Sequence, residues 1–276
     1  MERRIRKLSN GVKIPIVGFG TYKLQNENDE SCNIVKKAIN AGYRNIDTAS
    51  FYNNEEGVGK GIRESGIPRE ELFVTTKLWI DDDGYKNTIK AFNKSLENLG
   101  LDYIDLYLLH LPTENIKETW RAIEDLYKEK KVRSIGVCNC TAKQLEEIIG
   151  FSEINPMVNQ VEIHPNRPEK EILKACKRHN IVVQAWGSMM RGELLSNPII
   201  KNLAQKYNKK EAQILLRWHL QNNVIAIQKT SKSNRIKENI DIFDFEIEKE
   251  DIERIDLINK DERMKPQKYE NLYKIV

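Results

Sequence analysis

The segment AGYRNIDTASFY, residues 41–52, predicts a helix end, a short strand and a loop in succession. Gly42 is suited to closing a helix, residues 43–48 favour a strand, and the loop begins at Ala49. The strand would carry an acid, Asp47, to its carboxyl end, and the loop places a phenol, Tyr52, five residues further on. Taken singly, such an aspartate is more often a turn or cap residue, and such a tyrosine a loop aromatic.

The next two predicted strands also end on titratable side chains, Lys77 and His110. Because the carboxyl ends of neighbouring parallel strands lie on one edge, we expect these two residues to meet Asp47 and Tyr52 there. A lysine at a strand end is usually a solvated charge, and a histidine after an apolar strand is as often an interior residue. The expected position of all four residues on one rim is therefore stronger evidence for a site than any one of these residues alone.

Strand and helix patterns alternate along most of the chain. The predicted strands are residues 17–21, 43–48, 73–77, 103–110, 134–138, 157–161, 181–186 and 224–227. The predicted helices are residues 29–40, 55–64, 85–99, 114–130, one capped at 141, one from 168, 209–221 and 233–240. Doubly wound open sheets also alternate, but eight consecutive units without a break favour an α/β fold closed into a (β/α)8 TIM barrel.

Both ends of the chain add to this repeat. Residues 5–16 alternate apolar and polar side chains around Asn10-Gly11, which predicts a β-hairpin outside the main sheet, as a plug. Residues 248–259 predict an extra C-terminal helix after the eighth unit. No linker or composition shift marks a boundary, so we expect one domain over residues 1–276. The first strand is not followed by G-x-G-x-x-G, which argues against a Rossmann cofactor site.

Composition limits the partners. The 45 basic and 41 acidic residues are interspersed and leave a net charge of only +4, which argues against a nucleic-acid partner. No apolar run approaches the roughly 18 residues of a membrane span, and the basic start has no apolar run typical of a secretory signal. The spacing of the cysteines favours reduced thiols in the cytoplasm and predicts neither a disulfide framework nor a metal site; they are Cys32, Cys138, Cys140 and Cys176.

The four rim residues suggest proton transfer. A phenol titrates near ~10, and we expect the ammonium of Lys77 to lower the pKa of Tyr52. Asp47 would keep Lys77 charged and oriented, and His110 would orient a carbonyl oxygen. These groups are suited to protonating a developing alkoxide, but forming that alkoxide from a carbonyl needs a hydride donor, which implies a nicotinamide cofactor.

The chain resembles the aldo-keto reductases, a family of (β/α)8 barrels that use NADPH, and especially bacterial members similar to diketogluconate and glyoxal reductases. The matching motifs cover almost the whole chain: residues 42–49 with Tyr52, residues 99–110, residues 159–165, and residues 229–231 with Arg235. The resemblance implies that Asp47, Tyr52, Lys77 and His110 are catalytic, with Tyr52 as general acid.

The same resemblance implies an NADPH/NADP+ site with two ends. Asn139 and Gln160 would hold the nicotinamide carboxamide, and Trp186 would stack on the ring. At the adenosine end it implies contacts to the 2′-phosphate and to adenine from Lys229, Thr230, Ser231, Arg235, Glu238 and Asn239. Two basic side chains near a helix start suit a phosphate, so we expect NADPH to be preferred to NADH.

Several positions depart from the family pattern. Gln228 stands where a proline is common, Cys138 where a serine is common, and residues 187–189 read Gly-Ser-Met where Ser-Pro-Leu is common. Leu111 replaces a common tryptophan, and the tail after Asn259 is short, so we expect a wide substrate pocket. Its predicted walls are Tyr22, Phe51, Trp79, His110 and Leu111.

These observations predict a monomeric NADPH-dependent oxidoreductase that reduces small aldehydes and ketones such as glyoxals, diketogluconate or aromatic aldehydes. One alternative is a reductase or dehydrogenase of a bulkier steroid- or prostaglandin-type carbonyl, against which the short tail argues. Another is a non-catalytic binding module like the potassium-channel β-subunits, which carry extra interaction segments that this sequence does not show. A metal- or phosphate-dependent barrel enzyme lacks candidate ligands.

Overall fold

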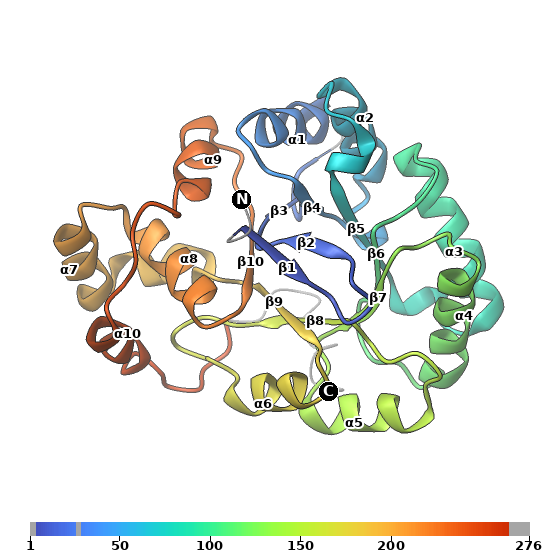
Figure 1. Cartoon of the computed structure of the whole chain (residues 1–276). Helices are drawn as coiled ribbons and strands as arrows, with labels where there is room; N and C mark the ends of the chain where they lie inside the picture. The colour runs from blue at the N-terminus through green and yellow to red at the C-terminus, as the bar shows by residue number, and fades with distance from the viewer. Residues whose placement is uncertain (1–3, 26–28, 265–276) are drawn as a thin grey trace.

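The computed structural model describes residues 4–25 and 29–264. Eight parallel strands form a closed barrel in the order β10-β3-β4-β5-β6-β7-β8-β9, and Figure 1 shows the helices arranged around it. The predicted (β/α)8 barrel is therefore confirmed. The barrel strands are β3 (Val17–Gly20), β4 (Asn45–Asp47), β5 (Phe73–Leu78), β6 (Leu106–Leu109), β7 (Ile135–Cys138), β8 (Val158–Glu162), β9 (Val182–Trp186) and β10 (Ile225–Gln228).

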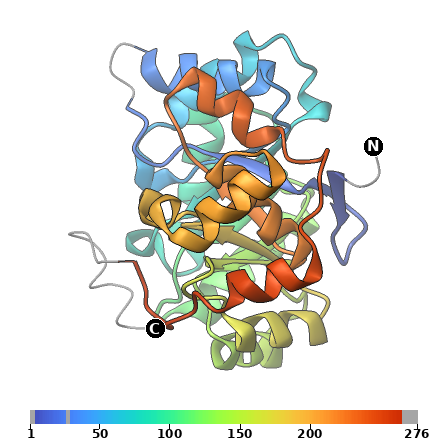
Figure 2. The same cartoon turned by 90° about the vertical axis from the view of Figure 1, so that its left-hand side faces the viewer.

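The helices around the barrel follow the predicted order. They are α1 (Glu30–Asn40), α2 (Glu55–Glu64), α3 (Tyr85–Leu99), α4 (Ile116–Lys128), α5 (Ala142–Phe151), α6 (Lys170–Arg178), α8 (Glu211–Gln221) and α9 (Ser233–Ile240). The predicted final helix is α10 (Lys249–Asp256), which packs against α7 (Pro198–Tyr207) on the side shown in Figure 2.

Helix α7 was not predicted, because its segment was interpreted as part of a long loop. Its start nevertheless carries two local signals. Pro198 occupies the first turn, and the side chain of Asn197 accepts a hydrogen bond from the Ile199 backbone N–H. Both are typical of a helix N-terminus, so a helix at this position could be predicted from the sequence.

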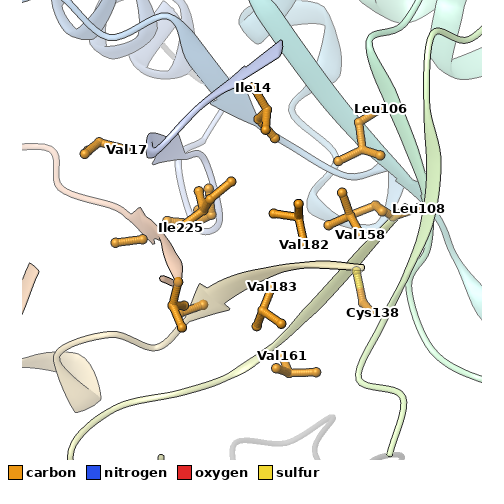
Figure 3. Packing of buried hydrophobic residues seen from close by; sticks show 14 of the residues in the cluster. Ile14, Val17, Leu106, Leu108, Cys138, Val158, Val161, Val182, Val183 and Ile225 are labelled. Carbon is orange, nitrogen blue, oxygen red and sulfur yellow. The ribbon is translucent and has the colours of Figure 1, made fainter. Parts of the chain in front are cut away.

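The predicted hairpin is present and separate from the barrel sheet. Strands β1 (Ile5–Lys7) and β2 (Lys13–Pro15) pair antiparallel, and Figure 1 shows them across the opening at the amino ends of the barrel strands. Ile14 is fully buried and points toward the apolar side chains inside the barrel, among them Leu106 (Figure 3). The hairpin thus closes the amino end of the barrel and leaves the carboxyl end for a site.

The interior is divided along the barrel axis. Its amino half is filled by branched apolar side chains such as Val17, Val158, Val182 and Ile225 (Figure 3). Polar and charged side chains are buried at the carboxyl ends of the same barrel strands; Asp47 at the end of β4 is an example. This layering is typical of TIM barrels, in which the amino half supplies stability and the carboxyl rim carries the chemistry. No helix within residues 4–25 and 29–264 is long and apolar enough to cross a membrane.

Helices α2 and α3 approach closely at Gly59. A β-carbon at this position would overlap the backbone carbonyl oxygen of Leu99, which cannot move away as a side chain could. We therefore expect Gly59→Ala to lower the free energy of unfolding by about 3 kcal/mol, measured by denaturant titration. Gly150→Ala is the matched control, because a β-carbon there meets no atom within 4 Å and should be neutral or slightly stabilising. Equal stability of the two variants would contradict this packing.

Candidate active site

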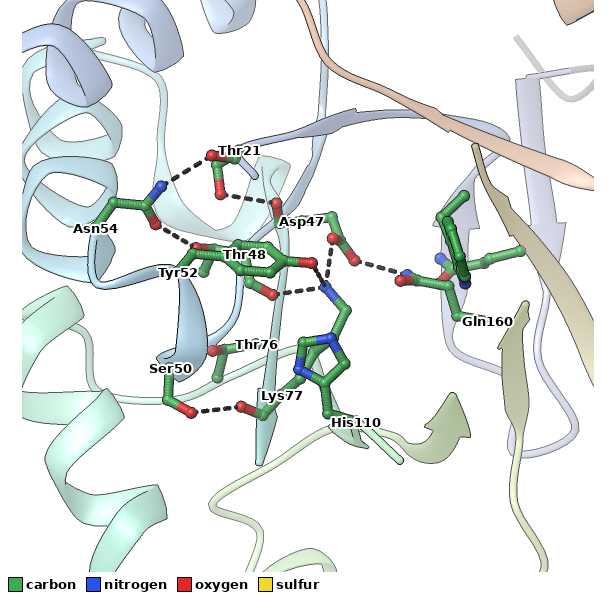
Figure 4. Close-up of polar contacts among 12 residues, drawn as sticks. Thr21, Asp47, Thr48, Ser50, Tyr52, Asn54, Thr76, Lys77, His110 and Gln160 are labelled. Carbon is green, nitrogen blue, oxygen red and sulfur yellow. Dashed lines mark hydrogen bonds and ion pairs between the residues drawn. The ribbon is translucent and has the colours of Figure 1, made fainter. Parts of the chain in front are cut away.

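Asp47, Lys77 and Tyr52 meet at the carboxyl end of the barrel (Figure 4). The Lys77 ammonium donates to Asp47 Oδ1 at 2.5 Å and to the Thr48 carbonyl oxygen at 2.8 Å, and it lies 3.4 Å from the Tyr52 hydroxyl. Lys77 is fully buried and Asp47 nearly so. The phenol and the ammonium thus share one site, in the arrangement that the strand ends predicted.

Tyr52 lies in a single helical turn, η3 (Ser50–Tyr52), that is pinned on both sides. The Ser50 hydroxyl donates to the Lys77 carbonyl oxygen at 3.0 Å, which ties the turn to β5. The buried Asn54 accepts from the Thr48 hydroxyl at 3.0 Å and donates to two carbonyl groups of the β3–α1 loop. These bonds hold the phenol over the barrel mouth.

The pKa of Tyr52 departs from the sequence prediction. Burial raises the pKa of Tyr52 to about 12, and the nearby Lys77 ammonium only partly offsets this, while the Asp47 carboxylate adds to the rise. The expected net lowering is therefore wrong in the free protein, because loss of water around the phenolate outweighs the ammonium. Burial by itself would lower the pKa of Lys77, but the Asp47 carboxylate reverses this and the pKa lies above its ordinary value. The lysine is charged and the phenol is protonated at neutral pH.

His110 is a neutral histidine at the same rim. Burial, and then the Lys77 charge, hold its pKa well below the ordinary value. Its ring lies edge-on to Trp79 at 5.1 Å and to Tyr52 at 5.8 Å, between ring centroids. Nδ1 is buried and has no hydrogen-bond partner among the described residues. A neutral imidazole in this position can donate one hydrogen bond to a carbonyl oxygen without bringing in a positive charge.

A cavity of about 700 Å³ opens at this rim and collects most of the predicted site residues. Its walls include Tyr22, Asp47, Phe51, Tyr52, Trp79, His110, Asn139, Gln160, Trp186, Lys229, Thr230, Arg235, Glu238 and Asn239. Lys77 lies behind the wall and reaches the cavity through Tyr52 and Asp47. Residues far apart in the sequence thus form one continuous surface, as expected for strand ends of a closed barrel.

Besides Lys77, two predicted residues lie outside this wall. Leu111 follows His110 beyond the end of β6, is buried and does not line the cavity. Its predicted role as a wall of the substrate pocket is therefore not supported. Ser231 is exposed and does not line the cavity, although Thr230 beside it does.

Other lining residues were missed by the motif reasoning. Lys23 follows Tyr22 directly in the β3–α1 loop, and Arg191 lies in η6 (Met190–Ser196) with a left-handed φ of 54°. Met264 also lines the cavity, and its backbone N–H donates to Glu162 Oε1 at 2.7 Å. The segment after Asn259 thus contributes Met264 to the cavity wall; residues 265–276, to which the tail prediction also applied, lie outside the described residues.

The side-chain amides of Asn139 and Gln160, near Tyr52, already make hydrogen bonds within the protein. Gln160 Nε2 donates to Asp47 Oδ2 at 2.7 Å and to Gln184 Oε1 at 2.9 Å, so its own carbonyl oxygen is the atom left for a ligand. The Trp186 indole N–H donates to Asn139 Oδ1 at 2.9 Å, and Asn139 Nδ2 donates to the His110 carbonyl oxygen at 3.0 Å. These bonds fix an aromatic face and two amides beside the proton donor, which suits a flat ring bearing a carboxamide.

The cavity also has a cationic end, beside the carboxyl ends of the neighbouring strands β3 and β10. Lys23, Lys229 and Arg235 line it, and burial lowers the pKa of Lys229, an effect that the charge of Glu30 opposes and that of Lys23 reinforces. A cavity with an aromatic and amide end and a cationic end fits an elongated anionic dinucleotide. Within the described part of the chain, no three His, Cys, Asp or Glu side chains are grouped to hold a metal ion.

The pattern that defines the aldo/keto reductase family matches residues 16–260. A protein named glyoxal reductase from Bacillus subtilis (strain 168) is 53% identical over 268 residues, covering 97% of each chain. A protein named 9,11-endoperoxide prostaglandin H2 reductase from Trypanosoma cruzi (strain CL Brener) is 46% identical, covering 93% of this chain and 92% of that protein.

Solved structures agree with this assignment. The crystal structure of a Bombyx mori aldo-keto reductase in complex with NADP superposes with a TM-score of 0.90 at 37% identity. The match covers 97% of this chain and 95% of that one. The fold, the rim residues and the full-length similarity lead to one conclusion: this chain belongs to the aldo/keto reductase family.

Proposed function

We propose that this protein is an NADPH-dependent reductase of small aldehydes and ketones, including glyoxals. The observation that carries the proposal is the Tyr52 hydroxyl 3.4 Å from the buried Lys77 ammonium, at the wall of a cavity that Lys23, Lys229 and Arg235 also line. The name of the 53% identical relative, glyoxal reductase, supports the choice of small dicarbonyls as substrates. We further propose that the protein works as a cytoplasmic monomer.

Each residue of the site has one task in this reaction. When bound, the reduced nicotinamide supplies the hydride that the protein lacks. His110 donates a hydrogen bond to the substrate carbonyl oxygen, and Tyr52 gives its proton to that oxygen as negative charge develops on it. Lys77 stabilises the resulting phenolate, and Asp47 holds Lys77 charged and directed toward the phenol.

Residues at both ends hold the cofactor in this proposal. Asn139 and Gln160 bind the carboxamide and Trp186 covers the ring, which excludes water from the reacting face. Lys229, Thr230 and Arg235 surround the 2′-phosphate, with Glu238 and Asn239 at the adenine. No role is proposed for Ser231, because it lies outside the cavity wall.

The test is NADPH oxidation by the purified protein across glyoxal, methylglyoxal, aromatic aldehydes, diketogluconate and simple ketones. We expect the highest kcat/KM for the small aldehydes. A bulkier substrate is the second candidate, favoured by the name of the Trypanosoma cruzi relative, so a steroid ketone and prostaglandin H2 belong in the same panel. No turnover with any carbonyl, despite bound NADPH, would contradict both and favour a binding module.

Arg235 is expected to distinguish NADPH from NADH. Replacing it with alanine removes a guanidinium from the cationic end and should raise the KM for NADPH by about 10- to 100-fold, the usual effect of losing a hydrogen bond between charged groups. The KM for NADH should change by less than about threefold. Lys232→Ala is the matched control, since Lys232 is exposed near the same helix start but does not line the cavity. Equal effects of Arg235→Ala on both cofactors would refute the 2′-phosphate assignment.

A further inference from the structure

Three buried side chains form a continuous hydrogen-bonded series beneath the cationic end of the cavity. Asn239 Nδ2 on α9 donates to Gln228 Oε1 at the end of β10, and Gln228 Nε2 donates to the Tyr43 hydroxyl. Tyr43 is fully buried, and Gln228 and Asn239 are 6% and 5% exposed. Gln228 and Asn239 line the cavity, whereas Tyr43 lies behind them.

The far end of this series is rigidly held. The Tyr43 ring packs edge-on against Phe19 of β3, with 5.4 Å between centroids and 68° between planes. Tyr43 lies two residues before the first residue of β4, Asn45, and neither β3 nor β4 can shift without disturbing the barrel. The hydroxyl of Tyr43 is therefore a fixed point for the amide of Gln228.

Fixing Gln228 also fixes which atom of Asn239 faces the cavity. An asparagine amide presents either its NH₂ or its carbonyl oxygen, and a half-turn exchanges the two. Because one N–H of Nδ2 donates to Gln228, the amide has its carbonyl oxygen and a second N–H left, and among the described residues none donates to the oxygen. The carbonyl oxygen accepts hydrogen bonds and repels other acceptors, so at this atom the cavity wall selects for a donor.

We infer that Gln228 is a positioning residue that holds the Asn239 carbonyl oxygen toward the exocyclic amino group of the cofactor's adenine. This inference rests on the proposed function, which places adenine beside Asn239. It adds a selectivity: a purine with a carbonyl in place of the amino group sets two acceptors against each other and binds more weakly. Gln228 acts through Asn239, since its own amide is committed to Asn239 and Tyr43.

The direction of the hydrogen bonds decides the selectivity. If Tyr43 instead donated to Gln228 and Gln228 to Asn239, the Asn239 amide would present its NH₂ and favour the carbonyl-bearing purine. The preference between the two purines therefore reports which way the series runs. This preference is a difference in binding affinity, so it tests the role of Gln228 without any measurement of turnover.

The experiment measures Kd by isothermal titration calorimetry for NADPH and for its hypoxanthine analogue, in which the adenine amino group is replaced by a carbonyl. For the wild type we expect NADPH to bind about 10-fold more tightly than the analogue, from one hydrogen bond gained or lost. In Gln228→Leu the Asn239 amide is released to turn over, and the preference should fall below about twofold. Gln228→Glu keeps an acceptor for both Asn239 Nδ2 and the Tyr43 hydroxyl, so it should retain the preference.

The outcomes separate this inference from the proposed function. Tight NADPH binding by the wild type with equal or tighter binding of the analogue would overturn the inference and leave the reductase assignment intact. Failure of the wild type to bind either dinucleotide would overturn the proposed function itself. Retention of the full preference in Gln228→Leu would show that Asn239 is held by other groups and would also overturn the role of Gln228. Loss of the preference in Gln228→Glu, which keeps an acceptor for Asn239 Nδ2, would overturn the inference as well. The test therefore does not depend on whether the leucine variant folds.

Discussion

Tyr52→Phe is expected to lower kcat for aldehyde reduction by about 10³-fold while the Kd for NADPH stays within about twofold of the wild type. The substitution removes only the hydroxyl that lies 3.4 Å from Lys77 and leaves the ring in place. The carbonyl oxygen then has no acid to protonate it, and Lys77 is too deeply buried to replace the phenol. Steady-state kinetics with methylglyoxal and a fluorescence titration with NADPH measure the two quantities.

Tyr22→Phe provides the matched control for this prediction. Tyr22 lines the same cavity, and its ring centroid lies 5.0 Å from that of Tyr52, but the hydrogen bonds of the Lys77 ammonium go to Asp47, Thr48 and Tyr52. We expect its kcat to change by no more than about threefold. A Tyr52→Phe enzyme that keeps more than about a tenth of the wild-type kcat would exclude Tyr52 as the acid.

The second large effect concerns the buried pair of Asp47 and Lys77. Lys77→Met leaves a carboxylate in the barrel to which, among the described residues, only Gln160 donates, and Asp47→Asn leaves an ammonium without its counter-charge. Breaking one partner of a buried pair usually costs about 3–5 kcal/mol in the free energy of unfolding, and we expect a loss of this size from each single variant. Denaturant titrations measure the loss.

The double variant Asp47→Asn with Lys77→Met distinguishes charge from packing. It leaves no isolated buried charge, so most of the stability lost in either single variant should return. Activity should not return, because nothing then stabilises the Tyr52 phenolate. If the two losses add in the double variant, the residues contribute independently and the pair is not an electrostatic unit.

Much of the fold could be predicted because local pattern and global architecture agree. The apolar spacing placed α2, α3 and α9 at their observed bounds, and eight uninterrupted strand–helix units implied closure of the sheet. Strand bounds were less accurate: residues 103–110 were predicted, but β6 is Leu106–Leu109. Pairing across the barrel, and not side-chain preference, determines where such a strand begins and ends.

The sequence allowed the grouping of the site residues to be predicted, because the fold geometry determines it. It did not allow the pKa of Tyr52 to be predicted. Parallel strands end at one rim, so Asp47, Lys77 and His110 had to be neighbours. The pKa of Tyr52 depends on how much water the surrounding loops exclude, and no motif expresses that. The contact between Gln228 and Tyr43 joins residues 185 positions apart, beyond the reach of any local pattern.

The pH dependence of catalysis in the two directions tests the role of Tyr52 most directly. Carbonyl reduction needs the protonated phenol, and alcohol oxidation needs the phenolate. With a pKa of about 12 for Tyr52, single-turnover reduction should be level between about pH 6 and pH 9, while oxidation should rise about tenfold per pH unit. Tyr52→Phe should remove that rise. An oxidation rate that is independent of pH in the wild type, or that rises equally in Tyr52→Phe, would contradict proton transfer by Tyr52.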